Sequence, residues 1–306
     1  MQYICYLILS ALVAVSCTGK QGQSGVNMVK EVSADTLSEL PLPELPSSLT
    51  SPEERAAYLA VHFWDAMDFS NHALSLDTVF MEQNFANYLS VFPAIAMRED
   101  MDKAVEALLQ RASKDSLATA FLQEVVDKYL QDPNSPMRNE EWLMVFYGQM
   151  LKIPAIPEWN KKRIAWRLEV ANKNRPGMTG TDFKYVSRKG VNGTMRQYNR
   201  TGNTLLVFYD PDCDNCKRIL GSLAQMQLPA DWRVLAIDAE RDRKRWNETK
   251  AGMPREWEVG YATTDILGQQ LYDLPAYPVI YLLDSKKRVI LKDPPLEQLM
   301  EYIRFK

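Results

Sequence analysis

Hydrophobic and polar residues follow two different patterns along the chain. Between residues 51 and 175, apolar residues recur every three or four positions, which is the period of a helix that buries one face. Prolines interrupt this pattern and divide it into about six expected helices, one beginning at Pro52 and the others around 77–92, 99–112, 115–131, 139–152 and 158–173. The pattern predicts an all-α N-terminal bundle over residues 51–175.

From residue 176 onward, short apolar runs alternate with turn residues. The runs 204–209 and 278–284 are nearly continuous, as in strands that are buried on both faces. The expected elements are a hairpin at 183–186 and 194–198, strands at 204–209, 232–237, 257–262, 278–284 and 288–291, and helices that open at Cys213 and at 239–250, 265–272 and 296–303. Alternating strands and helices predict an α/β layered domain over 176–306, so the fold class is two domains.

The first fifty residues have the sequence pattern of an export signal followed by a tether. Residues 3–15 are apolar except for Ser10, which is too short a run for a membrane-spanning helix of about 20 residues but suits the core of a signal peptide. With Cys17 just after it, the stretch 1–17 resembles a bacterial lipoprotein signal, which implies that Cys17 is acylated. Residues 18–50 are rich in glycine, serine and proline, and predict a flexible tether.

Composition and charge exclude several classes of function. The chain has 306 residues and a net charge of −3, so no nucleic-acid partner is expected. The basic runs 161–163 and 241–245 are expected to be solvated helix faces. The two histidines, His62 and His72, have no clear ligand companions, and a zinc site needs about four ligands. We therefore expect no metal and no cofactor.

Cys213 and Cys216 form a C-x-x-C motif that follows a buried strand and a turn and opens a helix. Unpaired N–H groups and the helix dipole favour a thiolate at such a helix N-terminus. Cys216 lies within the first turn, so its sulfur can reach Cys213. A Cys213 thiolate can attack a partner disulfide, and Cys216 can then resolve the mixed disulfide.

The order strand, turn, C-x-x-C and helix, followed by Tyr277-Pro278 and a buried strand, resembles the thioredoxin family over about residues 178–306. The resemblance is closest to membrane-tethered extracytoplasmic oxidoreductases of the TlpA/ResA type. It implies a cis bond before Pro278, a position beside the cysteines, and backbone groups of Tyr277 that bind an extended substrate. The helical segment resembles a domain of unknown function that precedes thioredoxin-like domains in Gram-negative lipoproteins.

This resemblance implies an enzyme, a thiol–disulfide oxidoreductase that reduces or isomerises disulfides through Cys213 and Cys216. The implied partners are exported proteins that bear thiols or disulfides, a membrane or periplasmic electron donor, and the membrane itself through a lipid anchor. The implied location is the cell envelope of a Gram-negative bacterium, either periplasmic or anchored to the outer membrane. The alternative is a binding or assembly lipoprotein in which the thioredoxin-like domain is a scaffold and its disulfide is structural.

The charges around the motif predict a reducing couple. Soluble thioredoxins carry a buried acid six residues before the first cysteine, where this chain has Val207. Three acidic residues surround the first cysteine, Asp210, Asp212 and Asp214, and two basic residues follow the second, Lys217 and Arg218. Since the aspartates oppose thiolate formation, we expect a couple more reducing than a strong disulfide-forming oxidant. Equilibration with glutathione measures the reduction potential of the Cys213–Cys216 pair, and a potential of about −120 mV contradicts this expectation.

Overall fold

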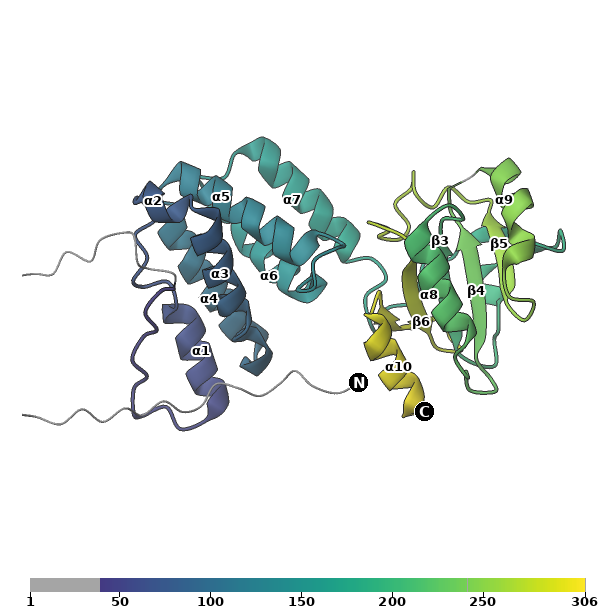
Figure 1. Cartoon of the computed structure of the whole chain (residues 1–306), viewed down its shortest axis with the longest axis horizontal. Coiled ribbons are helices and arrows are strands. Elements are labelled where there is room, and N and C mark those ends of the chain that lie inside the picture. Colours follow the sequence, from purple (N-terminus) through teal and green to yellow (C-terminus); the bar gives the residue numbers. More distant parts are fainter. Residues whose placement is uncertain (1–38, 241, 306) are drawn as a thin grey trace, which may run out of the picture. The chain divides into compact units, whose positions relative to one another are not determined.

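The computed structural model describes residues 39–240 and 242–305, and its first half is helical (Figure 1). The α-helices are α1 (Pro52–His62), α2 (His72–Ser75), α3 (Thr78–Leu89), α4 (Arg98–Ala112), α5 (Ser116–Val126), α6 (Glu140–Met150) and α7 (Glu158–Ala171), with a 3₁₀ turn η2 (Phe92–Ala94) and a π-helical turn η3 (Asp127–Gln131) between them. The six expected helices are confirmed, and the short α2 was not foreseen. The signal peptide, Cys17 and the tether up to residue 38 lie outside the described residues.

Local capping explains where these helices begin. At α1, the Ser51 side chain accepts from the backbone N–H of Glu54 at 3.1 Å, while the Glu54 carboxylate accepts from the N–H of Ser51 at 3.1 Å. This capping box, with Pro52 in the first turn, confirms the expected start. Asp77 and Asp115 are the N-caps of α3 and α5, and their side chains accept from backbone N–H groups of the first turn. Helices α4 and α7 begin without a side-chain cap.

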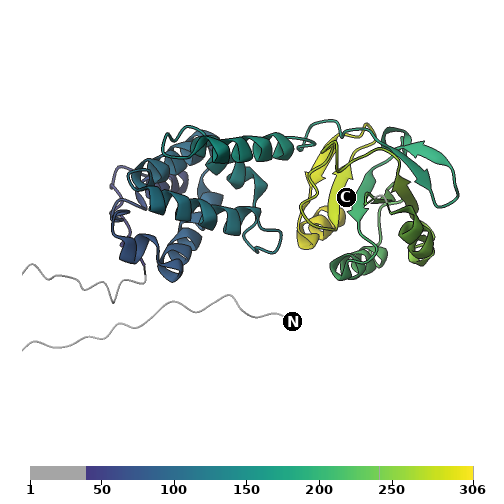
Figure 2. The same ribbon diagram turned by 90° about the horizontal axis from the view of Figure 1, so that it is seen from above.

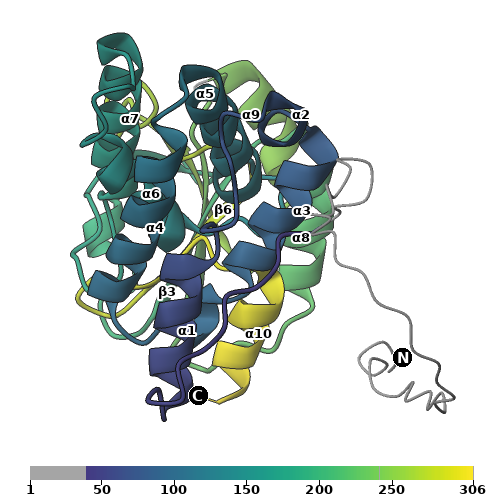
Figure 3. The same ribbon diagram turned by 90° about the vertical axis from the view of Figure 1, so that its left-hand side faces the viewer.

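Aromatic side chains fill the core of the helical segment. Helix α4 packs against α1 and α6, and α7 packs on α6 (Figure 3). The Trp64 ring meets the Tyr88 ring edge-on, with centroids 5.8 Å apart. Leu40, within the expected tether, is also buried, and its N–H donates to the Asn84 Oδ1 at 2.8 Å. The described end of the tether segment therefore contacts the helical core.

The second half of the chain forms a mixed sheet (Figure 2). Its strands are β1 (Lys184–Ser187), β2 (Asn192–Thr194), β3 (Thr204–Tyr209), β4 (Arg233–Asp238), β5 (Glu258–Ala262), β6 (Val279–Leu283) and β7 (Val289–Lys292). In the described residues they run in the order β2-β1-β5-β4-β3-β6-β7. Strands β3, β4 and β5 are parallel to one another, whereas β6 pairs antiparallel with β3. This is a thioredoxin-like sheet, and the strands expected at 183–186, 204–209, 232–237, 257–262, 278–284 and 288–291 are confirmed. The strand expected at 194–198 is wrong, because β2 ends at Thr194 and Met195–Gln197 form a 3₁₀ turn, in which the Thr194 hydroxyl accepts from the N–H of Gln197 at 3.3 Å.

Helices α8 (Asp214–Ala224) and α10 (Leu296–Arg304) cover one face of this sheet (Figure 2). Cys216, Leu220 and Leu299 are buried there against alternate residues of the central strands. Helix α9 (Arg243–Thr249) is anchored by Trp246, which packs on Tyr261. The C-x-x-C motif therefore lies at the start of a helix that packs on the sheet.

The helix expected at 265–272 is wrong, because this segment is a series of turns. The Asp265 Oδ1 accepts from the N–H of Gly268 at 3.0 Å, and Gln270 has a φ of 50°. The N–H of Leu271 donates to the carbonyl of Ile266 at 3.0 Å, which closes the chain reversal. A side chain that satisfies nearby backbone groups competes with helix formation, and Gly268 weakens the helix further.

The described residues of the two halves belong to one compact unit. Ion pairs join helical residues to the sheet segment: Arg138 lies 2.6 Å from Asp293, and Lys292 lies 2.8 Å from Glu140. The expected boundary between two domains near residue 175 therefore stays a prediction. Within the described part of the chain, no helix has both the length and the apolar character that crossing a bilayer requires.

Lys287 gives the fold a pH-dependent stability. Its side chain is only 1% exposed, and its Nζ donates to the Thr204 Oγ1 at 2.8 Å and to the Asn199 carbonyl at 3.0 Å. Burial lowers the pKa of Lys287 from 10.5 to about 8. Between these two values the unfolded chain holds a proton that the folded chain lacks, so the free energy of unfolding rises with pH through this window.

We expect the free energy of unfolding of the wild-type protein to increase relative to that of a Lys287→Met variant between pH 8 and pH 10.5. Urea unfolding of both proteins across this range measures the difference, and titrations that both share cancel. Lys286→Met, at an exposed neighbouring position, is the control and should show no such trend. A Lys287→Met difference that stays constant with pH contradicts the assignment.

Candidate active site

The site is built at the edge of the sheet where β3 ends. After Tyr209 the chain turns through Asp210, and Cys213 becomes the N-cap of α8 with φ −74° and ψ 116°. The N–H of Cys213 donates to the carbonyl of Asp210 at 3.2 Å. The N–H of Cys216 donates to the Cys213 sulfur at 3.2 Å, so a sulfur takes the place of the usual capping oxygen.

The loop before β6 brings Tyr277 and Pro278 against the same sulfur. The Tyr277–Pro278 peptide bond is cis, which confirms the expectation for this position. The Cys213 thiol donates to the carbonyl of Tyr277 at 3.5 Å, and the Asn215 side-chain amide donates to the same oxygen at 3.3 Å. The expected neighbourhood of Cys213, Cys216 and Pro278 is thus present, while substrate binding by Tyr277 and Pro278 stays a prediction.

The two cysteines differ strongly in their surroundings. Cys213 is half-buried, whereas Cys216 is only 1% exposed and belongs to the core beneath α8. Burial, with a smaller contribution from the neighbouring Cys213 sulfur, raises the pKa of the Cys216 thiol to about 12. Cys216 is therefore a protonated thiol at neutral pH, and Cys213 is the more exposed of the two cysteines.

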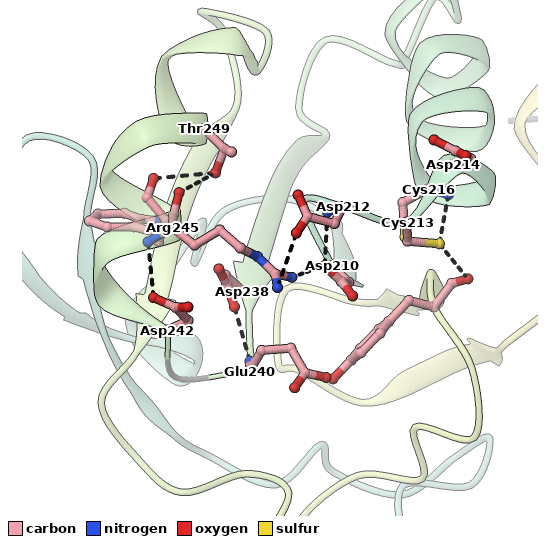
Figure 4. Close-up of polar contacts among 12 residues, drawn as sticks. Asp210, Asp212, Cys213, Asp214, Cys216, Asp238, Glu240, Asp242, Arg245 and Thr249 are labelled. Atoms are coloured by element: carbon pink, nitrogen blue, oxygen red, sulfur yellow. Dashed lines mark hydrogen bonds and ion pairs between the residues drawn. The ribbon is translucent and has the colours of Figure 1, made fainter.

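Arg245 joins α9 to the turn in front of Cys213 (Figure 4). Its guanidinium bonds the Asp210 carboxylate through Nη2 and lies 3.2 Å from the Asp212 carboxylate through Nη1. Asp214 is paired as well, with Lys217 Nζ at 2.9 Å. The expectation that 241–245 is a solvated face is wrong at Arg245, which is half-buried because two acidic side chains draw it toward the turn.

A buried acid lies on the strand next to β3. Asp238 ends β4 and is paired in parallel register with Tyr209, and its side chain is buried. Burial raises the pKa of Asp238 to about 6, although its Oδ1 accepts from the N–H of Glu240 at 2.9 Å. Sequence reasoning found no acid at Val207 and missed this one. Its signal was an aspartate directly after the apolar run 234–237.

A groove of about 610 Å³ opens between α8 and the segment that follows α9. Its walls are mainly apolar and include Leu220, Met253 and Pro254. Cys216 also lines this groove, although it is only 1% exposed.

The other expected residues lie away from this site. His62 bonds Asp65 through Nδ1 at 2.7 Å, and His72 bonds Asp115 through Nε2 at 2.9 Å. In the part of the chain that the structure describes, no group of three or more histidine, cysteine or acidic side chains is placed to hold a metal ion. The predicted lipidation site, Cys17, falls outside the described residues.

Comparisons with known proteins agree with this geometry. A protein-family profile described as a domain of unknown function, DUF5106, matches residues 16–174. A crystal structure of a thioredoxin-like protein from Bacteroides caccae is 31% identical, with a TM-score of 0.80, and the match covers 88% of this chain and 99% of that one. No curated protein matches the chain.

Two further solved structures match a smaller part of the chain. A conserved protein of unknown function from Bacteroides fragilis is 42% identical over 42% of this chain and 98% of that one, with a TM-score of 0.39. The C-terminal domain of an uncharacterized protein from Bacteroides fragilis is 31% identical over 43% of this chain and 98% of that one, with a TM-score of 0.41.

We expect iodoacetamide to modify Cys213 at least about tenfold faster than Cys216 in the reduced protein at pH 7.5. The physical reason is that Cys213 is half-exposed at a helix N-terminus, while Cys216 is buried and its pKa is raised to about 12. Fragmentation mass spectrometry of the peptide that carries both cysteines locates each modification over time. Equal rates at the two positions rule out the asymmetry, and urea-unfolded protein is the control in which the rates should converge.

Proposed function

Because this chain belongs to the family of thioredoxin-like proteins that carry an N-terminal DUF5106 domain, we propose that it is a thiol–disulfide oxidoreductase. Its reaction is the reduction or isomerisation of disulfides in exported proteins, and Cys213 and Cys216 are the reacting residues. The observation that carries this proposal is the half-exposed Cys213 sulfur, which lies at the N-terminus of α8 within reach of the N–H of Cys216.

The surroundings of Cys213 support a reactive sulfur rather than a structural one. The N–H groups at the start of α8 and the helix dipole stabilise negative charge at this point. The carbonyl of Tyr277 contacts the Cys213 sulfur and also accepts from the Asn215 side-chain amide, so a backbone polar group of the loop lies beside the sulfur. A purely structural disulfide needs neither the exposure nor the loop.

In the first step, the Cys213 thiolate attacks one sulfur of the partner disulfide. A Cys213–partner disulfide forms, the partner's own disulfide breaks, and its other sulfur leaves as a thiolate that takes up a proton. In the second step, Cys216 loses its proton and attacks the Cys213 sulfur. The Cys213–Cys216 disulfide then forms, the second partner sulfur is released, and two electrons have passed from the dithiol to the partner.

The oxidised pair must be reduced again for a further turnover. We propose that an electron donor in the membrane or periplasm supplies two electrons by the same type of exchange. Isomerisation differs, because a different thiolate of the partner attacks the partner sulfur of the mixed disulfide in place of Cys216. A new partner disulfide then forms, the Cys213–partner bond breaks, and the Cys213 thiolate is released, so no electron donor is needed.

The remaining parts of the proposal concern location and organisation. We propose that residues 1–17 direct export, that Cys17 carries a lipid anchor, and that the protein acts in the cell envelope of a Gram-negative bacterium. The helical segment 51–175 is then a domain of its own between the tether and the redox domain 176–306. Its match to DUF5106 supports a defined domain but supplies no activity.

We expect a Cys216→Ser variant to accumulate mixed disulfides with partner proteins through Cys213, because the resolving sulfur is absent. Alkylation in acid followed by non-reducing electrophoresis of cell envelopes reveals these adducts, which should disappear on reduction. A Cys213→Ser/Cys216→Ser variant is the matched control and should trap nothing. If Cys216→Ser also traps nothing, the exchange reaction is wrong and the scaffold alternative stands.

A further inference from the structure

We propose that Arg245 is a positioning residue of the redox site. Its guanidinium neutralises Asp210 and Asp212 and thereby keeps the Cys213 sulfur reactive. The role of this residue in catalysis rests on the exchange reaction proposed above, whereas its effect on the sulfur can be measured without any partner.

The turn that presents Cys213 carries two acidic side chains. The Asp210 carboxylate accepts from the N–H of Asp212 at 2.9 Å, and the Asp210 carbonyl accepts from the N–H of Cys213 at 3.2 Å. Asp210 is thus fixed in place by the same turn that fixes the cysteine. A carboxylate fixed in the turn that leads to the cysteine disfavours the thiolate unless a cation offsets it.

Arg245 is placed to offset both carboxylates at once. One Nη atom bonds Asp210, and the other lies 3.2 Å from Asp212, so a single planar guanidinium spans the turn. The Arg245 side chain is 29% exposed and that of Asp210 is 26% exposed, so water screens this pair less than a fully exposed one.

The backbone around Arg245 is held independently of the turn. Asp242 caps α9 and accepts from the N–H of Arg245 at 3.0 Å, and the Thr249 hydroxyl donates to the Arg245 carbonyl at 2.9 Å. The next residue, Trp246, is buried against Tyr261. Arg245 therefore belongs to a helix that packs on the sheet, and Figure 4 shows its side chain extending from this helix to the turn.

The test measures how fast iodoacetamide alkylates Cys213 at pH 7, in a Cys216→Ser background so that the peptide carries one thiol. We expect Arg245→Met to lower this rate about three- to tenfold, because one or two uncompensated carboxylates then face the sulfur. Arg245→Lys keeps the charge but loses the planar guanidinium that contacts both carboxylates, so its alkylation rate should fall between those of Arg245→Met and the parent. Arg243→Met is the matched control, since Arg243 is exposed on the same helix and lies over the Tyr261 ring.

A rescue variant separates charge from structural support. Replacing Asp210 and Asp212 by asparagine removes the charges but keeps the acceptor oxygens that brace the turn. Adding these two changes to Arg245→Met should restore the rate to within about twofold of the parent, if the change is purely electrostatic. If the alkylation rate stays low in this combined variant, Arg245 only supports the structure of the turn, and the proposal is overturned. An Arg245→Met rate equal to that of Arg243→Met also overturns it.

Failure of this inference is distinguishable from failure of the proposed function. Alkylation reports the chemistry of one sulfur and needs no partner protein. If Cys216→Ser traps no partner in cells while the alkylation rate still depends on Arg245, only the exchange reaction fails. If partners are trapped while Arg245→Met alkylates like the control, only the role of Arg245 fails.

Discussion

The contact between the N–H of Cys216 and the sulfur of Cys213 is the interaction around which the site is arranged. Every α-helix begins with unpaired N–H groups, and most use a side-chain oxygen to satisfy one of them. Here a sulfur does so, and an anionic sulfur is a better acceptor than a neutral one. The same contact therefore caps α8 and fixes the position of the Cys213 sulfur, so the start of the helix and the geometry of the site depend on one atom.

Parallel pairing of β3 with β4 determines what surrounds this contact. The two strands end in register, Tyr209 beside Asp238, so the chain leaves both at the same edge of the sheet. The turn after β3 leads to Cys213, and the turn after β4 leads to α9 and Arg245. Residues more than thirty positions apart in the sequence thus meet across one short edge, which is where ligands bind in open α/β sheets.

The parts of the fold that were predictable are those that local pattern specifies. The run 204–209 is apolar on both faces because α8 and α10 cover one face of β3, while Phe183 and Tyr272 pack on the other. The start of α1 was predictable because Ser51 and Glu54 form a capping box within four residues. The turn at 265–272 was mispredicted because its periodicity resembles a helix, while Asp265 satisfies the backbone instead.

The parts that were not predictable depend on contacts between distant residues. The ion pairs of Arg245 with Asp210 and Asp212 place one residue of a basic run beside the turn that precedes Cys213, and nothing in the spacing of the run indicates these pairs. The same holds for Leu40, whose N–H is satisfied by Asn84 across 44 positions. Cys213, Cys216 and Pro278 were found from sequence only because a motif marks them.

In the exchange reaction that we propose, the different burial of the two cysteines would impose an order on the two steps. Burial is the main reason that the pKa of Cys216 is raised to about 12, but the hydrogen bond and the charge of Cys213 contribute to it. When Cys213 enters a mixed disulfide, that charge is lost, so Cys216 ionises more easily than before. Ionisation of Cys216 is therefore favoured once the mixed disulfide has formed and disfavoured before that. A buried thiol beside a capping thiolate acts second because the first step removes part of what held its proton.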